Sequence, residues 1–202
     1  MSASGFIIKN LNEFKRDLGM EDQRRIKAAH TAVRVEAFAL MKALKTEIRS
    51  GAPGGKSFTP LTEIAKAFRR GKKAKAQKPL YRLAAPVRYR VDKNQGNMAA
   101  HVGWVDTGKQ KASSSWQGIV KMQQTGRQLP ISGHIRESML KLGQKMKKQG
   151  IPEAKYLFLR KSTTDFDIPA RPIMAPFWEA HESQSEQNII ANFARKMRGE
   201  RI

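Results

Sequence analysis

The stretch EDQRRIKAAHTAVRVEAFALMKALKTEIR, residues 21–49, decides how the rest of the chain has to fold. Its apolar residues recur at spacings of three and four, which places them along one face of an α-helix. At about 1.5 Å per residue this helix is about 43 Å long, so we expect it to pack against other elements of the chain and against a neighbouring subunit. The apolar face consists of Ile26, Ala29, Val33, Ala37, Leu40, Met41, Leu44 and Ile48.

A glycine- and proline-rich segment, residues 51–57, ends this helix. The segment superficially resembles a phosphate-binding loop, but it follows a helix instead of a strand and Pro53 removes one amide, so we interpret it as a turn. Thr59, Pro60 and Glu63 then supply the cap, first-turn proline and early acid that start a second helix. This helix is expected to run to about Arg70.

Two segments with strand character follow, at residues 87–91 and 98–105. The first alternates perfectly between apolar and polar residues, and the turn between the two contains Asn94, Gly96 and Asn97, so we predict an antiparallel hairpin. Residues 156–159, Tyr-Leu-Phe-Leu, are predicted to form a further strand that completes the sheet.

Three more helices are predicted, at residues 116–124, 135–148 and 176–197. We expect the polar middle of the last one, residues 182–187, to be solvated. The side chains expected to point inward are Met139, Leu142 and Met146 on the second of these helices, and Phe177, Ile189, Ile190, Phe193 and Met197 on the third. The pattern predicts an α+β fold in which a long N-terminal helix and a C-terminal helix pack around a small antiparallel sheet. We expect one domain over residues 1–202, with a basic loop at about 69–79 and an inserted helix at about 135–148.

Charge is the most unusual property of the composition. The chain has 39 Lys and Arg against 17 Asp and Glu, a net charge of +22. Residues 64–148 hold 20 basic and three acidic residues, whereas the segments before and after them are nearly balanced. A field of this sign favours polyanions or an acidic protein surface as partners.

The densest positive charge lies in a block with no acid between Glu63 and Asp92. We expect this block to contact nucleic acid phosphates, or to be a solvated loop over an acidic neighbour. Aromatic residues do not interrupt the block, so any nucleic acid contact would be electrostatic and independent of base sequence. The expected polyanion contacts are Arg69, Arg70, Lys72, Lys73, Lys75 and Lys78.

The sequence contains no recognisable catalytic, cofactor or metal site. There is no cysteine, and the four histidines (His30, His101, His134 and His181) lie far apart with none at metal-ligand spacing. His181 and Glu182 are candidate metal ligands, and Asp165 and Asp167 are candidate paired acids in a loop. Neither pair has the further partners that such a site needs. We therefore expect no enzyme activity and no cofactor. No apolar run is long enough for a membrane span, and we expect a soluble protein.

The segment DIPARPIMAPFW, residues 167–178, is the most informative stretch for function. Pro169 and Pro172 fix an extended backbone around Arg171, whose forked guanidinium suits a carboxylate or backbone carbonyls. Pro176 can begin a helix at its first turn. The plain alternative is a stiff connector. The residues expected at an oligomer or partner interface are Pro169, Arg171, Pro172, Phe177 and Trp178.

Ile-Pro-Ala-Arg-Pro before a terminal helix resembles the closing signature of the phage virion-morphogenesis and tail-completion (neck) proteins. Other segments agree in order: Phe-Thr-Pro-Leu-Thr at 58–62, Lys-Pro-Leu at 78–80, the strand pair, and Met-Gln-Gln-Thr-Gly at 122–126. The resemblance extends over about residues 20–200. The chain departs from the family pattern after Pro79-Leu80, where Thr-Gly-x-Leu is usual, and through an apparent insertion at 131–152.

The resemblance implies a virion structural protein at the head–tail junction, forming a ring, most simply a hexamer, around the DNA channel. It implies other neck and tail proteins as partners, non-specific contact with genomic DNA, and a location in the virion after assembly in the host cytoplasm. The alternative from composition alone is a cellular, sequence-independent nucleic-acid-binding protein.

Overall fold

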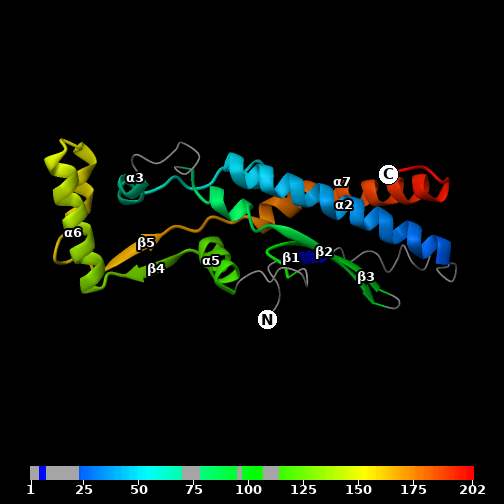
Figure 1. Cartoon of the computed structure of the whole chain (residues 1–202), viewed down its shortest axis with the longest axis horizontal. Coiled ribbons are helices and arrows are strands. Elements are labelled where there is room, and N and C mark those ends of the chain that lie inside the picture. The colour runs from blue at the N-terminus through cyan, green and yellow to red at the C-terminus, as the bar shows by residue number, and fades with distance from the viewer. Residues whose placement is uncertain (1–4, 8–22, 70–77, 95–96, 107–113) are drawn as a thin grey trace.

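Two long helices, α2 (Gln23–Ser50) and α7 (Met174–Met197), lie side by side and antiparallel along much of the molecule (Figure 1). The computed structural model describes residues 5–7, 23–69, 78–94, 97–106 and 114–202. Helix and sheet are both present, so the predicted α+β class is confirmed, with a long N-terminal helix, a C-terminal helix and a small antiparallel sheet.

The α2 helix buries the face that the sequence predicts. Its stripe is confirmed from Ala29 to Ile48, both fully buried, and Ala28 and Ala32 extend it. Ile26 is the exception: 39% of it is exposed, because the core that covers the helix begins only at Ala28. Alanine is frequent on this face, and Ala28, Ala29, Ala32 and Ala37 are all buried.

The α7 helix differs from prediction at two positions. Phe177, Ile189 and Phe193 are buried as expected, but Ile190 is 54% exposed. The middle of the helix is not fully solvated, because Ser185 is only 1% exposed. Ser185 precedes Ile189 by four residues and therefore shares its face, whereas Ile190 is rotated by about 100°. The small serine side chain is accommodated against α2 there.

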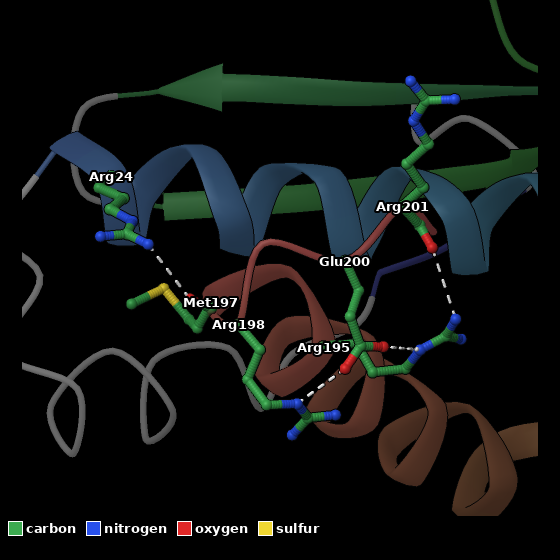
Figure 2. Close-up of polar contacts among 6 residues, drawn as sticks. All are labelled: Arg24, Arg195, Met197, Arg198, Glu200 and Arg201. Atoms are coloured by element: carbon green, nitrogen blue, oxygen red, sulfur yellow. Dashed lines mark hydrogen bonds and ion pairs between the residues drawn. The ribbon is translucent and has the colours of Figure 1, made fainter.

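Polar contacts close the C-terminal end of α7 (Figure 2). Glu200 accepts hydrogen bonds from Arg195 at 2.9 Å and Arg198 at 2.8 Å, and these bonds hold the pKa of its carboxyl below the usual range. Arg24 of α2 reaches across to donate to the Met197 carbonyl at 3.4 Å. The bond from Arg24 supplies a donor to a carbonyl at the end of the helix, where carbonyls lose their intrahelical partners.

A three-stranded antiparallel sheet packs against α2. Its order is β1 (Gly5–Ile7), β3 (Asn97–Gly103), β2 (Arg88–Asn94), and the pairing of Arg88 with Gly103 through Asn94 with Asn97 confirms the predicted hairpin. Val102 and Trp104 are fully buried in the core cluster, which also includes residues of α2 and α7. The Trp104 indole donates a hydrogen bond to the Leu83 carbonyl at 3.0 Å, and Leu83 belongs to a 3₁₀ helix at Tyr81–Ala84.

A second lobe extends from the helix pair at the opposite end of the molecule (Figure 1). It consists of β4 (Arg127–Pro130), α6 (Gly133–Lys148), a 3₁₀ helix at Pro152–Leu157 and β5 (Asp165–Ile168), which pairs antiparallel with β4. The helix predicted at 135–148 is present as α6. The lobe packs with α3 (Glu63–Arg69) around a separate apolar cluster of Ala67, Met139, Met146, Ala154 and Leu157.

The strand predicted at 156–159 is wrong. That segment lies in and after the 3₁₀ helix, where Ala154 and Leu157, three residues apart, are both buried against α6. The last strand lies instead at β5, so Asp165 and Asp167 belong to a strand and not to a loop; both are exposed.

Candidate functional site

The segments singled out in the sequence meet at one place, where α5 (Ser114–Thr125) ends and α7 begins. The backbone amide of Arg171 donates to the Gln123 carbonyl at 2.7 Å, and the amide of Met174 donates to the Gln124 side-chain oxygen at 3.1 Å. The two consecutive glutamines therefore fix the proline-arginine segment from both its centre and its far end. We call this meeting point the Arg171 junction.

The guanidinium of Arg171 is the centre of this junction. The residue is only 5% exposed. Its Nε donates to the Thr59 carbonyl at 2.9 Å, its Nη2 to the Pro60 carbonyl at 3.0 Å, and its Nη1 to Gln123 Oε1 at 3.4 Å. A buried cation is tolerated only when its donors are satisfied, and here backbone carbonyls do this. The guanidinium thus ties the segment just before α3 to the segment just before α7.

Gly126 allows the chain to turn from α5 into β4 at the junction. Its φ is +70°, and a Cβ at this position would lie 2.8 Å from the Ala170 nitrogen and 2.9 Å from the Ile168 carbonyl oxygen. The backbone of 168–170 therefore passes too close for any side chain. This close approach explains the glycine that ends the Gln-Gln-Thr-Gly segment.

A cavity of about 190 Å³ opens beside the Arg171 junction. Leu80 in its wall has a φ of +55°, the one positive φ of a non-glycine residue in the described part of the chain. Such strain persists only where the surroundings hold it in place. The wall also presents Gln123, Asp167 and Arg171, and its apolar part comes from Leu61, Ala65, Pro79, Leu80, Ile168 and Pro169.

The predicted interface residues divide into buried and accessible ones. Arg171 and Phe177 are buried within the chain, and the Thr59 and Pro60 carbonyls that accept hydrogen bonds from Arg171 belong to its own chain. Pro172 is exposed, and Pro169 and Trp178 are half-buried. Pro169, Pro172 and Trp178 thus keep accessible surface, whereas Arg171 is buried.

The predicted polyanion block lies largely outside the described residues. Arg70, Lys72, Lys73 and Lys75 fall within 70–77, and only the backbone of Arg69 is described, at the end of α3. Lys78 is exposed, directly before the cavity wall at Pro79.

A row of polar contacts between α2 and α7 was not predicted from the sequence. The Asn188 amide donates to Glu36 Oε1 at 3.3 Å, and His181 Nε2 lies 2.6 Å from Glu47 Oε1. Glu36 is 4% exposed, and burial raises the pKa of its carboxyl, although the bond from Asn188 opposes this. The partner of His181 is thus Glu47 and not the neighbouring, exposed Glu182. An acid on the apolar face, as at Glu36, is the signal that could have revealed these contacts.

Within the described residues, no group of three or more histidine and acidic side chains is arranged to hold a metal ion. In the same part of the chain, every helix is too short or too polar to cross a bilayer. Comparison with protein-family models, with curated proteins and with solved structures finds no match for this chain.

Proposed function

We propose that this chain is a non-enzymatic structural protein of a phage virion, placed at the head–tail junction as a homo-oligomeric ring around the DNA channel. A hexamer would match the symmetry of a tail. Its partners would be other neck and tail proteins, and its location the virion, after assembly in the host cytoplasm. The proposal rests on the resemblance of the proline-arginine segment and the segments that precede it to tail-completion proteins.

The observation that carries the proposal is the spatial meeting of those segments. The segments at 58–62, 78–80, 122–126 and 168–172 are separated by up to about a hundred residues of sequence, yet all four contribute to the Arg171 junction or its cavity. Segments that resemble a family in order and that also meet in one place are what a shared fold would produce. The apparent insertion at 131–152 projects away from this junction as the second lobe, so it leaves the junction intact.

The accessible residues around the junction suggest how a neighbouring subunit would contact it. Arg171 holds the segment from inside, while Pro172 on the surface is already fixed in φ. A partner that binds such a rigid segment loses little conformational entropy in ordering it. We therefore place Pro172 and Trp178 at the subunit interface, with Arg171 as their internal support.

Assembly is the experiment that tests this proposal. Size-exclusion chromatography with light scattering at micromolar concentration, followed by negative-stain electron microscopy, should show a closed ring. Pro172→Glu should lose the ring and remain folded by circular dichroism, whereas Ala191→Glu, on an exposed part of α7, should keep it. A wild-type chain that stays monomeric in all these measurements would contradict the proposal.

The net charge of +22 favours a second candidate, a sequence-independent nucleic-acid-binding protein. This candidate predicts a monomer that shifts nucleic acid at low salt. Lys72, Lys73 and Lys75 are then expected to contact phosphates, and replacing all three with glutamine should reduce the salt slope of binding by up to about 2.7, at about 0.9 per contact.

A further inference from the structure

The α2 helix carries a second continuous stripe, on the side away from α7. Five residues at spacings of four and three form it: Arg34, Phe38, Lys42, Lys45 and Arg49. At 3.6 residues per turn they share one face, nearly opposite Glu36 and Glu47, which contact α7. Arg34, Phe38, Lys42 and Arg49 are exposed and Lys45 is half-buried. We call this set the α2 cationic stripe.

Aromatic rings from neighbouring elements extend the stripe sideways. The Lys42 ammonium lies 4.3 Å from the centre of the Phe38 ring, and that ring meets the Tyr89 ring of β2 edge-on at 5.9 Å. Farther along, the Arg49 guanidinium lies 6.0 Å from the centre of the Tyr81 ring. The surface therefore combines cations with aromatic side chains, an arrangement that the linear basic block at 69–78 lacks.

The positive charge of the stripe is not neutralised by nearby acids. In the described part of the chain, Arg34, Lys42, Lys45 and Arg49 form no ion pair with a carboxylate. Partial burial, followed by the nearby charges of Arg88 and Arg49, lowers the pKa of the Lys45 ammonium. Like charges are thus gathered here at a cost, which an anion would relieve.

We propose that the α2 cationic stripe binds the phosphate backbone of nucleic acid without reading its sequence. From Arg34 to Arg49 the helix advances about 22 Å. A duplex rises by about 3.4 Å per base pair, so this length spans about six steps, although each strand also winds around the axis. The line of four cations is therefore long enough to contact several phosphates of a duplex at once. This site is separate from the Arg171 junction and does not depend on the virion role.

The aromatic rings favour nucleic acid over an acidic protein as the occupant. Phe38 is 41% exposed beside Lys42, so a cation and a partly exposed ring are offered together. A nucleic acid presents sugars next to each phosphate, which a ring can contact in a duplex, and a single strand also presents unpaired bases, which stack on the aromatic side chains of proteins that bind it without sequence preference. An acidic peptide would use the cations and leave the ring without a role.

The test compares two triple variants with equal loss of charge. Arg34, Lys42 and Arg49 are replaced with glutamine in one, and Lys145, Lys147 and Lys148 on the exposed side of α6 in the other; all six residues are exposed. Binding to a duplex of about twenty base pairs and to poly-glutamate is measured by fluorescence anisotropy over a series of salt concentrations. Circular dichroism melts check that both variants are folded.

The stripe variant should lower duplex affinity and reduce the salt slope by up to about 2.7, whereas the α6 variant should leave the slope within about one unit of wild type. An unchanged slope in the stripe variant overturns the proposal, as does an equal loss in both variants, which would be an effect of net charge alone. Poly-glutamate competing as well as duplex at equal charge would assign the surface to an acidic protein instead. None of these outcomes depends on ring assembly, so the two proposals can fail separately.

Discussion

His181 Nε2 of α7 lies 2.6 Å from Glu47 Oε1 of α2, and the two residues are 134 positions apart in the chain. The other oxygen of Glu47 accepts a hydrogen bond from the Gly54 amide at 2.7 Å. The His181 ring also packs on Phe177, with 4.4 Å between ring centres. One carboxylate thus joins the end of the first long helix, the turn that follows it and the start of the last helix.

Gly54 in this turn should tolerate no side chain. Its φ is +58°, and a Cβ would lie 1.9 Å from the Pro176 carbonyl oxygen, a backbone atom that cannot give way. We expect Gly54→Ala to cost more than about 4 kcal/mol of unfolding free energy, at the exceptional end for single substitutions. Thermal and urea denaturation measure this.

Gly55 provides the matched control. Its φ is +76°, but a Cβ there meets nothing within 4 Å. Gly55→Ala should therefore cost only the backbone strain, about 1–2 kcal/mol. Equal losses of stability in the two variants would mean that the close approach of the turn to α7 is not the reason why position 54 requires glycine.

The buried Glu36 carboxyl should make the stability of the fold depend on pH. Burial raises the pKa of its carboxyl above the 4.5 of an unburied glutamate, so the folded chain binds this proton more tightly than the unfolded chain does. Its contribution to stability therefore falls as pH rises from about 4.5 through the raised pKa, and the cost of the buried carboxylate is fully present above it. Glu36→Gln keeps an oxygen for the Asn188 amide and removes that cost.

We expect Glu36→Gln to raise the melting temperature relative to wild type at pH 8, and to raise it less at pH 4. Glu182→Gln, an exposed position on α7, is the control and should change the melting temperature little at either pH. A Glu36→Gln variant that is destabilised at pH 8 and not at pH 4 would reverse the sign of this argument.

The helices of this fold could be predicted from the sequence because their signals are local. The period of α2, the glycine after α5 and the apolar face of α6 each lie within one segment. The β2–β3 hairpin was equally accessible, since its turn residues lie between its strands. The β4–β5 pair was not, because its strands are four residues each and more than thirty residues apart.

The chemistry of the Arg171 junction could be predicted only in part. The two prolines indicated a rigidly held arginine, and that arginine is indeed fixed. Backbone carbonyls were one of the two acceptor types expected for it, but that they are those of Thr59 and Pro60, 112 and 111 residues away, leaves no mark in a sequence. The α2 cationic stripe escaped prediction for a related reason: its rings at Tyr81 and Tyr89 come from other elements, which only the fold brings beside α2.

Arg171 should matter for the stability of the single chain. Arg171→Gln shortens the side chain and leaves the Thr59 and Pro60 carbonyls without their donor, so we expect a loss of roughly 2–5 kcal/mol. Arg171→Lys keeps the charge and loses the fork, and it should recover only part of this. Arg34→Gln, at an exposed site, should change the unfolding free energy by less than about 0.5 kcal/mol. An Arg171→Gln variant as stable as wild type would show that the fork does not hold the junction.

Gly126 tests the same junction through the backbone. Gly126→Ala must place a Cβ 2.8 Å from the Ala170 nitrogen at a φ of +70°, so the extended segment that presents Arg171 has to move. We expect a loss of about 3 kcal/mol or more, with reduced hydrogen-exchange protection of the Arg171 amide, which donates to the Gln123 carbonyl.

Gly118→Ala is the control within α5, where a Cβ meets nothing within 4 Å. Because alanine favours a helix over glycine, this control should gain roughly 0.5–1 kcal/mol. If Gly126→Ala kept both its stability and the protection of the Arg171 amide, the close approach of 168–170 to the turn would not be what joins α5 to α7.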